Sequence, residues 1–171
     1  MGSAPLEIER VWRLRGPPII PPNCEIWKIE QGYLPVQPKD ASDFAEGRVR
    51  RIESPSGAVR WVHTVKRGGG LVRQETEHEI DEATFDSLWQ RTIGRRIRKK
   101  RFRFVHHGLT WELDQFLDWP LWMVEVELPT ESTPIHMPEW LAPLVADEVT
   151  NQPEWRNFSL ATRGPPSAAT G

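Results

Sequence analysis

Two pairs of glutamates, each separated by a single residue, are the first candidates for chemistry in this sequence. Glu7 and Glu9 lie near the amino terminus, and Glu125 and Glu127 lie in the last third of the chain. Side chains two residues apart on an extended strand point to the same face, so each pair presents two carboxylates together. Carboxylate oxygens are the ligands that hard divalent cations prefer. The pairs therefore indicate a divalent-metal site.

Basic residues show the same spacing elsewhere in the chain. Arg48 and Arg50 form one set, and the second set consists of Lys99, Arg101 and Arg103. A surface lined with arginine and lysine is unfavourable when it is buried without counter-charge. We therefore expect the basic sets to bind a compact polyanion, and the carboxylate pairs to hold metal ions that neutralise and orient it.

Strands must position these residues, because the charged positions alternate with apolar ones. A period of two is typical of β-strands. We expect strands over residues 6–15, 31–34, 48–52, 59–66, 71–80, 97–105, 109–116 and 121–128. The strand at 71–80 carries both signs of charge, with Arg73, Glu75 and Glu77 on one face.

Helices are expected at three places. Asp81 is a good N-cap for a helix that ends near Gly94. A short turn of helix is expected at 23–28, and the apolar segment 137–145 should form a helix packed on the outside of the strands.

The alternation allows two architectures. A sheet with one solvated face gives the same pattern, but most of the charged strands carry sets of a single sign, and the apolar helix faces need apolar strand faces to cover. A barrel with the charges inside satisfies both features, and about eight strands close a barrel that can hold one small ligand. We expect a mainly β fold, a closed eight-stranded antiparallel tunnel with a few outer helices. It should form one domain over 1–163, followed by a disordered tail over 164–171.

Composition sets broader limits. The 171 residues carry a net charge of −2, so no overall field selects nucleic acid or an anionic membrane. The single cysteine, Cys24, excludes an intrachain disulfide and fits a reducing compartment. No apolar run reaches the roughly 20 residues that span a bilayer. We expect a cytoplasmic protein, a monomer or homodimer, with no membrane partner and no nucleic acid. The histidines show no metal-ligand spacing and are interpreted as surface or packing residues.

In order and spacing, the motifs resemble those of the CYTH domain family, the triphosphate tunnel metalloenzymes. The resemblance runs from Leu6 to Ala161. It rests on 7–11 (E-x-E-x-K in the family), 31–34 (Q-G-Y-L), 48–50 (R-x-R), 64–66 (T-x-K), 73–77 (R-x-E-x-E), 99–102 (K-x-R-F), 111–116 (W-x-x-D-x-F), 125–128 (E-x-E-L) and the closing segment 148–161.

The resemblance implies metal-dependent hydrolysis of a triphosphate, with inorganic tripolyphosphate as the first candidate substrate. It implies catalytic roles for Glu7, Glu9, Lys66 and Glu127. The triphosphate would be bound by Arg13, Arg48, Arg50, Lys66, Arg73, Lys99 and Arg101. Mg²⁺ or Mn²⁺ would be held by Glu7, Glu9, Glu75, Glu77, Glu125 and Glu127.

One position departs from the family pattern. Val11 stands where the opening motif has a lysine, and Arg13, on the same strand face, could partly replace that charge. Three functions therefore stay open: a metal-dependent triphosphatase, which we prefer, a triphosphate- or nucleotide-binding module with little turnover, and an adenylyl cyclase.

Overall fold

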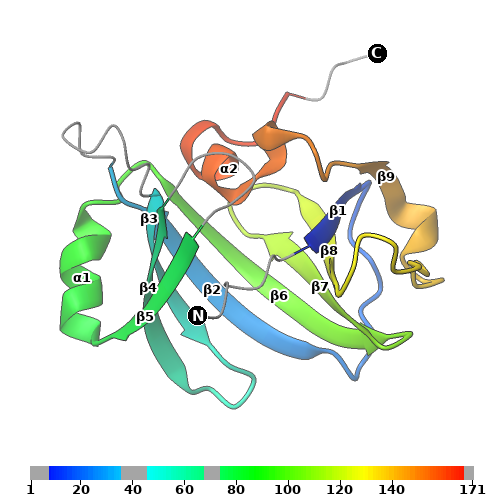
Figure 1. The fold of residues 1–171 in the computed structure, drawn as a ribbon, viewed down its shortest axis with the longest axis horizontal. Helices are drawn as coiled ribbons and strands as arrows, with labels where there is room; N and C mark the ends of the chain where they lie inside the picture. Colours follow the sequence, from blue (N-terminus) through cyan, green and yellow to red (C-terminus); the bar gives the residue numbers. More distant parts are fainter. Residues whose placement is uncertain (1–7, 36–45, 68–73, 168–171) are drawn as a thin grey trace.

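The computed structural model describes residues 8–35, 46–67 and 74–167, which contain nine strands and two α-helices (Figure 1). The strands are β1 (Ile8–Leu14), β2 (Glu25–Tyr33), β3 (Glu46–Glu53), β4 (Val59–Arg67), β5 (Gln74–Ile80), β6 (Arg96–His106), β7 (Leu109–Phe116), β8 (Trp122–Leu128) and β9 (Val145–Glu148). The helices are α1 (Glu82–Gln90) and α2 (Asn157–Arg163), with short 3₁₀ turns η2 (Ala142–Leu144) and η3 (Pro153–Trp155).

All nine strands belong to one antiparallel sheet in the order β5-β4-β3-β2-β6-β7-β8-β1-β9. The mainly β, antiparallel fold is confirmed. The closed eight-stranded barrel is not what the structure shows, because the sheet has nine strands and its outer strands, β5 and β9, do not pair with each other among the described residues. Alternation identifies the face of each residue, but it carries no information about which edges of a sheet meet.

The helices were only partly predicted. Asp81 caps α1 as expected, since its Oδ1 accepts a hydrogen bond from the Thr84 backbone N–H at 2.7 Å. The helical turn at 23–28 is wrong, because from Glu25 the chain pairs with β6, and a short helix has little stability of its own. The helix at 137–145 is also wrong: Pro143 lacks a backbone donor, and this segment forms η2 and begins β9.

Sequence alternation predicted neither α2 nor its position. No described helix has the length and apolar character that crossing a membrane would require.

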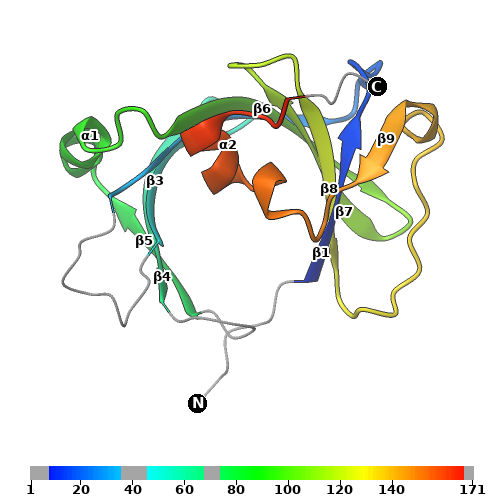
Figure 2. The same ribbon diagram turned by 90° about the horizontal axis from the view of Figure 1, so that it is seen from above.

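The convex face of the sheet carries an apolar cluster. Trp111, Leu113, Val124 and Val126 are fully buried in it, and Leu141, from the segment between β8 and β9, covers them. On the other half of the sheet, α1 packs outside β3 and β4 (Figure 2).

Gly32 explains part of the 31–34 motif. A Cβ at Gly32 would lie 2.5 Å from Oγ1 of Thr92, which follows α1. Only a glycine therefore lets the turn after α1 pack this closely on β2.

The concave face is partly filled by the carboxyl-terminal segment. Figure 2 shows α2 inside the curve of the sheet, where it contacts β6 and β2. Leu160 is fully buried there, and the Phe158 ring meets the Tyr33 ring edge-on with centroids 5.2 Å apart. The remainder of the concave face carries polar and charged side chains beside a smaller apolar cluster of Ile29, Ile52 and Val62.

Candidate active site on the concave face

The strand register gathers the charged residues onto the concave face. Directly opposed residues of antiparallel strands place their side chains on the same face. One row across the sheet runs through Glu25, Arg103, Glu112, Glu125 and Val11. The next row runs through Trp27, Arg101, Asp114, Met123 and Arg13. The carboxylates of β7 and β8 therefore lie beside the basic residues of β6.

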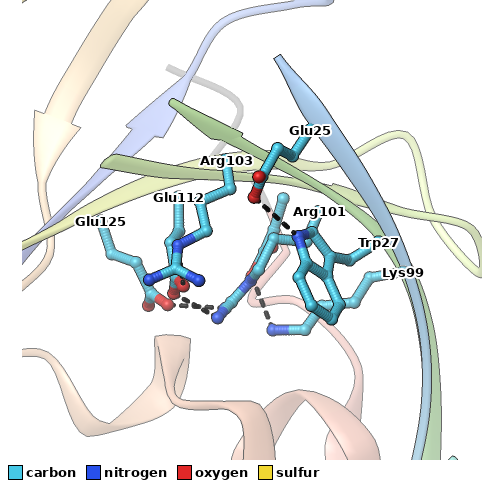
Figure 3. Close-up of polar contacts among 8 residues, drawn as sticks. Glu25, Trp27, Lys99, Arg101, Arg103, Glu112 and Glu125 are labelled. Atoms are coloured by element: carbon cyan, nitrogen blue, oxygen red, sulfur yellow. Dashed lines mark hydrogen bonds and ion pairs between the residues drawn. The ribbon is translucent and has the colours of Figure 1, made fainter. Parts of the chain in front are cut away.

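Arg101 is the centre of a buried ion network (Figure 3). Its Nε and Nη2 donate to both oxygens of Asp114, at 2.7 and 2.8 Å. Nη2 also donates to Glu125 at 2.6 Å, and Nη1 donates to Glu112. Lys99 donates to Asp114 at 2.6 Å. Because all five groups come from β6, β7 and β8, the network fixes their side chains relative to one another.

Because these groups are shielded from water, each charge strongly shifts the pKa values of its neighbours. Burial would raise the pKa of Asp114, but Arg101 and Lys99 outweigh it and hold that pKa at about 2. Burial raises the pKa of Glu125 to about 7 against the opposing effect of Arg101. Burial also lowers the pKa of Lys99, and the neighbouring guanidinium adds to the effect. An additional cation near Glu125 would therefore favour its ionised form.

A further group of carboxylates on this face lies at the β1–β8 pairing. Glu9 is directly opposite Glu127, and Glu125 is two residues away on the same face. Like charges directly opposite each other are destabilising, so this arrangement fits a divalent cation. Among the described residues, no three histidine, cysteine, aspartate or glutamate side chains already surround a metal position. Glu7, the other predicted ligand on this strand, lies outside the described residues.

The second basic set lies on the other half of the sheet. Arg50 donates to Glu77 at 2.6 Å, and Arg48 is opposite the buried Thr64 in the β3–β4 register. Lys66 and Glu75 face each other in the β4–β5 register, but only their backbone is described. Arg73 lies outside the described residues. The structure thus places Arg48, Arg50 and Glu77 on the concave face, across the sheet from Glu9 and Glu127.

Val11 and Arg13 are held by the carboxyl-terminal segment. Val11 packs at the edge of the apolar cluster that α2 completes, and its backbone N–H donates to Thr150 Oγ1 at 3.0 Å. Arg13 pairs with Asp147 at 2.8 Å and lies over the Trp155 ring at 5.3 Å. Arg13, a predicted phosphate ligand, is therefore ion-paired within the protein through Nη2, whereas its buried Nε has no hydrogen-bond partner among the described residues.

Glu112 and Asp114 are two acidic residues of the site that the sequence motifs did not identify as such. In the sequence, Asp114 belongs to the 111–116 motif without an assigned role, and nothing singles out Glu112. The two residues form another acidic pair with a spacing of two, the signal that identified the glutamate pairs of β1 and β8. What the sequence did not show is that β6 lies directly beside them, which makes them the counter-ions of Lys99 and Arg101.

Comparison with known proteins gives relatives but no matching family model. An inorganic triphosphatase of Nitrosomonas europaea is 35% identical over 138 residues, which cover 78% of this chain and 83% of that protein. An inorganic triphosphatase of Acetivibrio thermocellus is 33% identical over 94 residues, or 53% of this chain and 58% of that protein. The crystal structure of the inorganic triphosphatase NE1496 superposes with a TM-score of 0.68 at 30% identity, covering 96% of this chain and 99% of that one.

Proposed function

Since the chain belongs to the inorganic triphosphatase family, of the triphosphate tunnel type that its motifs resemble, we propose that it hydrolyses inorganic tripolyphosphate with a divalent metal ion. One observation carries the proposal. The concave face brings basic side chains from β3 and β6 together with carboxylates from β1 and β8. A triphosphate with bound metal ions has the matching charges, negative on its oxygens and positive on the metal.

The phosphate-binding residues in this proposal are the basic ones of the concave face. They are Arg48, Arg50, Lys99 and Arg101, with Lys66 and Arg73 as further members. Arginine donates two parallel hydrogen bonds to a phosphate, which fixes its orientation as well as its position. Phosphoryl transfer depends mostly on such positioning and on stabilisation of charge.

The proposed ligands of Mg²⁺ or Mn²⁺ are Glu9, Glu125 and Glu127, with Glu7, Glu75 and Glu77 as further members. A metal ion bound there would neutralise phosphate charge and lower the pKa of a coordinated water.

Arg101 links the two groups. A phosphate oxygen that accepts a hydrogen bond from Arg101 Nη2 competes with Glu125, which holds that donor at 2.6 Å. Losing this ion pair frees the Glu125 carboxylate for a metal ion. Substrate and metal binding should therefore reinforce each other through this one side chain.

A second function, triphosphate binding with little turnover, is supported by Val11. Its side chain lies among apolar groups next to α2, so no cation is provided at this position. Losing one charge-assisted hydrogen bond reduces binding or rate by roughly 10- to 100-fold.

We further propose that the protein acts on a small polyanion in the cytoplasm, as a monomer or homodimer. The single Cys24 supports the reducing compartment.

The deciding experiment measures phosphate release from tripolyphosphate, ATP and thiamine triphosphate with Mg²⁺ or Mn²⁺, with chelated metal as the blank. We expect metal-dependent release, fastest from tripolyphosphate. Tripolyphosphate binding by calorimetry without release from any of the three would establish the binding module instead. Cyclic AMP formed from ATP would establish a cyclase.

A further inference from the structure

Three of the five histidines gather on the convex face. His106 ends β6, His107 follows it in the turn to β7, and His136 comes from the segment between β8 and η2. The ring centroids of His106 and His107 are 4.4 Å apart, and those of His107 and His136 are 4.9 Å apart. With Met137 and Glu139, they line a surface cavity of about 570 Å³.

The backbone at His107 is unusual. His107 has φ of 49° and Gly108 has φ of 73°, which is the two-residue hairpin turn with both central residues left-handed. Asn-Gly is the common sequence in such a turn, and a non-glycine residue there carries about 1–3 kcal/mol of strain. Here a histidine occupies the strained position and its ring lies between two other imidazoles.

The spacing of the rings is close to that of a metal centre. Two imidazoles that bind one zinc ion through nitrogens about 2.0–2.1 Å away have ring centres roughly 5 Å apart. As they stand, no three described histidine, cysteine, aspartate or glutamate side chains could hold one metal ion, so the imidazole rings would have to turn toward it. His107 and His136 are both exposed, so their rings are free to rotate toward a shared ion without disturbing the core.

We propose that His106, His107 and His136 form a binding site for a late first-row divalent transition metal, Zn²⁺, Ni²⁺ or Cu²⁺. Imidazole suits these metals, whereas the carboxylates of the concave face suit Mg²⁺ and Mn²⁺. Glu139 lines the same cavity and supplies an anionic oxygen as a further ligand. The bound ion would tie the β6–β7 hairpin to the segment around Trp140, which packs on Phe104 and covers the convex core.

The test is a calorimetric titration of the full, untagged chain with Zn²⁺ in excess Mg²⁺, so that the carboxylate site is saturated. We expect one equivalent to bind. His107→Asn tolerates the left-handed turn but removes the imidazole, and His136→Ala changes an exposed residue. Each should weaken binding about tenfold or more, because even an outer-shell partner is worth about 10- to 100-fold in metal affinity.

The matched control is the variant carrying both His63→Ala and His78→Ala, which lie opposite each other on β4 and β5. It should bind Zn²⁺ as the unmodified chain does, and circular dichroism should show every variant folded. Zn²⁺ should also raise the unfolding temperature of the unmodified chain but not of His136→Ala. Absence of binding, unchanged binding in both cluster variants, or loss only in the control would overturn the proposal. Because these histidines lie away from the concave face, failure of the triphosphatase assay would leave this result unaffected.

Discussion

Arg101 shows how the concave face is balanced when no substrate is bound. Its guanidinium contacts three carboxylates, and Lys99 shares one of them. Lys99, Arg101 and Arg103, which pairs with Glu112 at 4.0 Å, carry +3, and Glu112, Asp114 and Glu125 carry −3 when all are ionised, so the charges cancel. Lys99 and Arg101 therefore already have counter-charges when no substrate is bound. In the proposed function, a polyanion would have to exchange with these carboxylates, and a divalent metal ion held by them would favour that exchange.

The carboxylates of the β1–β8 pairing give the most direct test of the metal site. Glu9→Gln and Glu127→Gln keep the side-chain shape but remove the charge. We expect each to lower metal-dependent tripolyphosphate hydrolysis by about 100-fold or more, since a lost charged ligand is worth several kcal/mol. Glu131→Gln, an exposed residue after β8, is the control and should keep full activity. Full activity in both test variants would show that the metal lies elsewhere.

Glu125 gives a prediction about pH. Its pKa is raised to about 7 in the folded protein from an ordinary value of 4.5. Between these pH values the folded state binds more protons than the unfolded state, so the free energy of unfolding falls as pH rises. With metal ions removed by a chelator, we expect the free energy of unfolding to fall by about 1–3 kcal/mol between pH 4.5 and about pH 7.

The control for this pH effect is Glu125→Gln, which cannot titrate at that position. In denaturant unfolding from pH 4.5 to 7.5, the free energy of unfolding of the unmodified protein should fall relative to that of the variant, and the contribution of the histidines, common to both, cancels in the difference. Parallel curves for the two proteins would contradict the assignment.

At the residue scale, alternation predicted much of this site but not its pairing. It assigned Glu9, Glu127, Arg48 and Arg101 to one face, and the register confirms that they share it. It could not show that Arg13 would pair with Asp147 and lie over the Trp155 ring, because these contacts depend on where the carboxyl-terminal segment folds.

At the scale of the elements, most strands were predictable, but the first half of β2, expected as a helical turn, and the short helix α2 were not. β6 alternates between charged and apolar residues over 101–104 and pairs with β2 and β7 on either side, so local pattern and tertiary contacts agree there. α2 has seven residues, too few for a helix to be stable without packing. Its helical form depends on burying Leu160 against the concave face, which the local sequence does not reveal.

Val11 couples β1 to α2, and Val11→Lys tests that coupling. The substitution supplies the cation of the family motif opposite Glu125, but it places a charged side chain at the edge of the apolar cluster that α2 completes. We expect a decrease of about 1–3 kcal/mol in the free energy of unfolding. Val11→Met, which is of similar length and uncharged, should be less damaging. If instead the lysine variant is as stable as the methionine variant and hydrolyses tripolyphosphate faster, packing against α2 does not exclude a cation from this position.

At the scale of the whole molecule, the strands that the structure describes leave the sheet open, and its charged residues are distributed over both halves. Arg48, Arg50 and Glu77 lie on β3 and β5 near one edge, and Glu9 and Glu127 lie on β1 and β8 near the other. The sequence could not distinguish an open sheet from a closed tunnel, because the register between first and last strands is a long-range property. A ligand that binds both halves would connect edges that the backbone leaves unpaired.

Such a ligand should stabilise the whole fold. With tripolyphosphate and Mg²⁺ at about 100 times their dissociation constant, we expect about 2.7 kcal/mol of added stability, or several degrees in unfolding temperature for a chain of this size. Backbone hydrogen exchange should slow both in the group β3, β4 and β5 and in the pair β1 and β8, because the phosphates would contact the first group and the proposed metal ligands lie in the second. Glu127→Gln should show neither effect. Protection confined to one half of the sheet would mean that the ligand does not span the concave face.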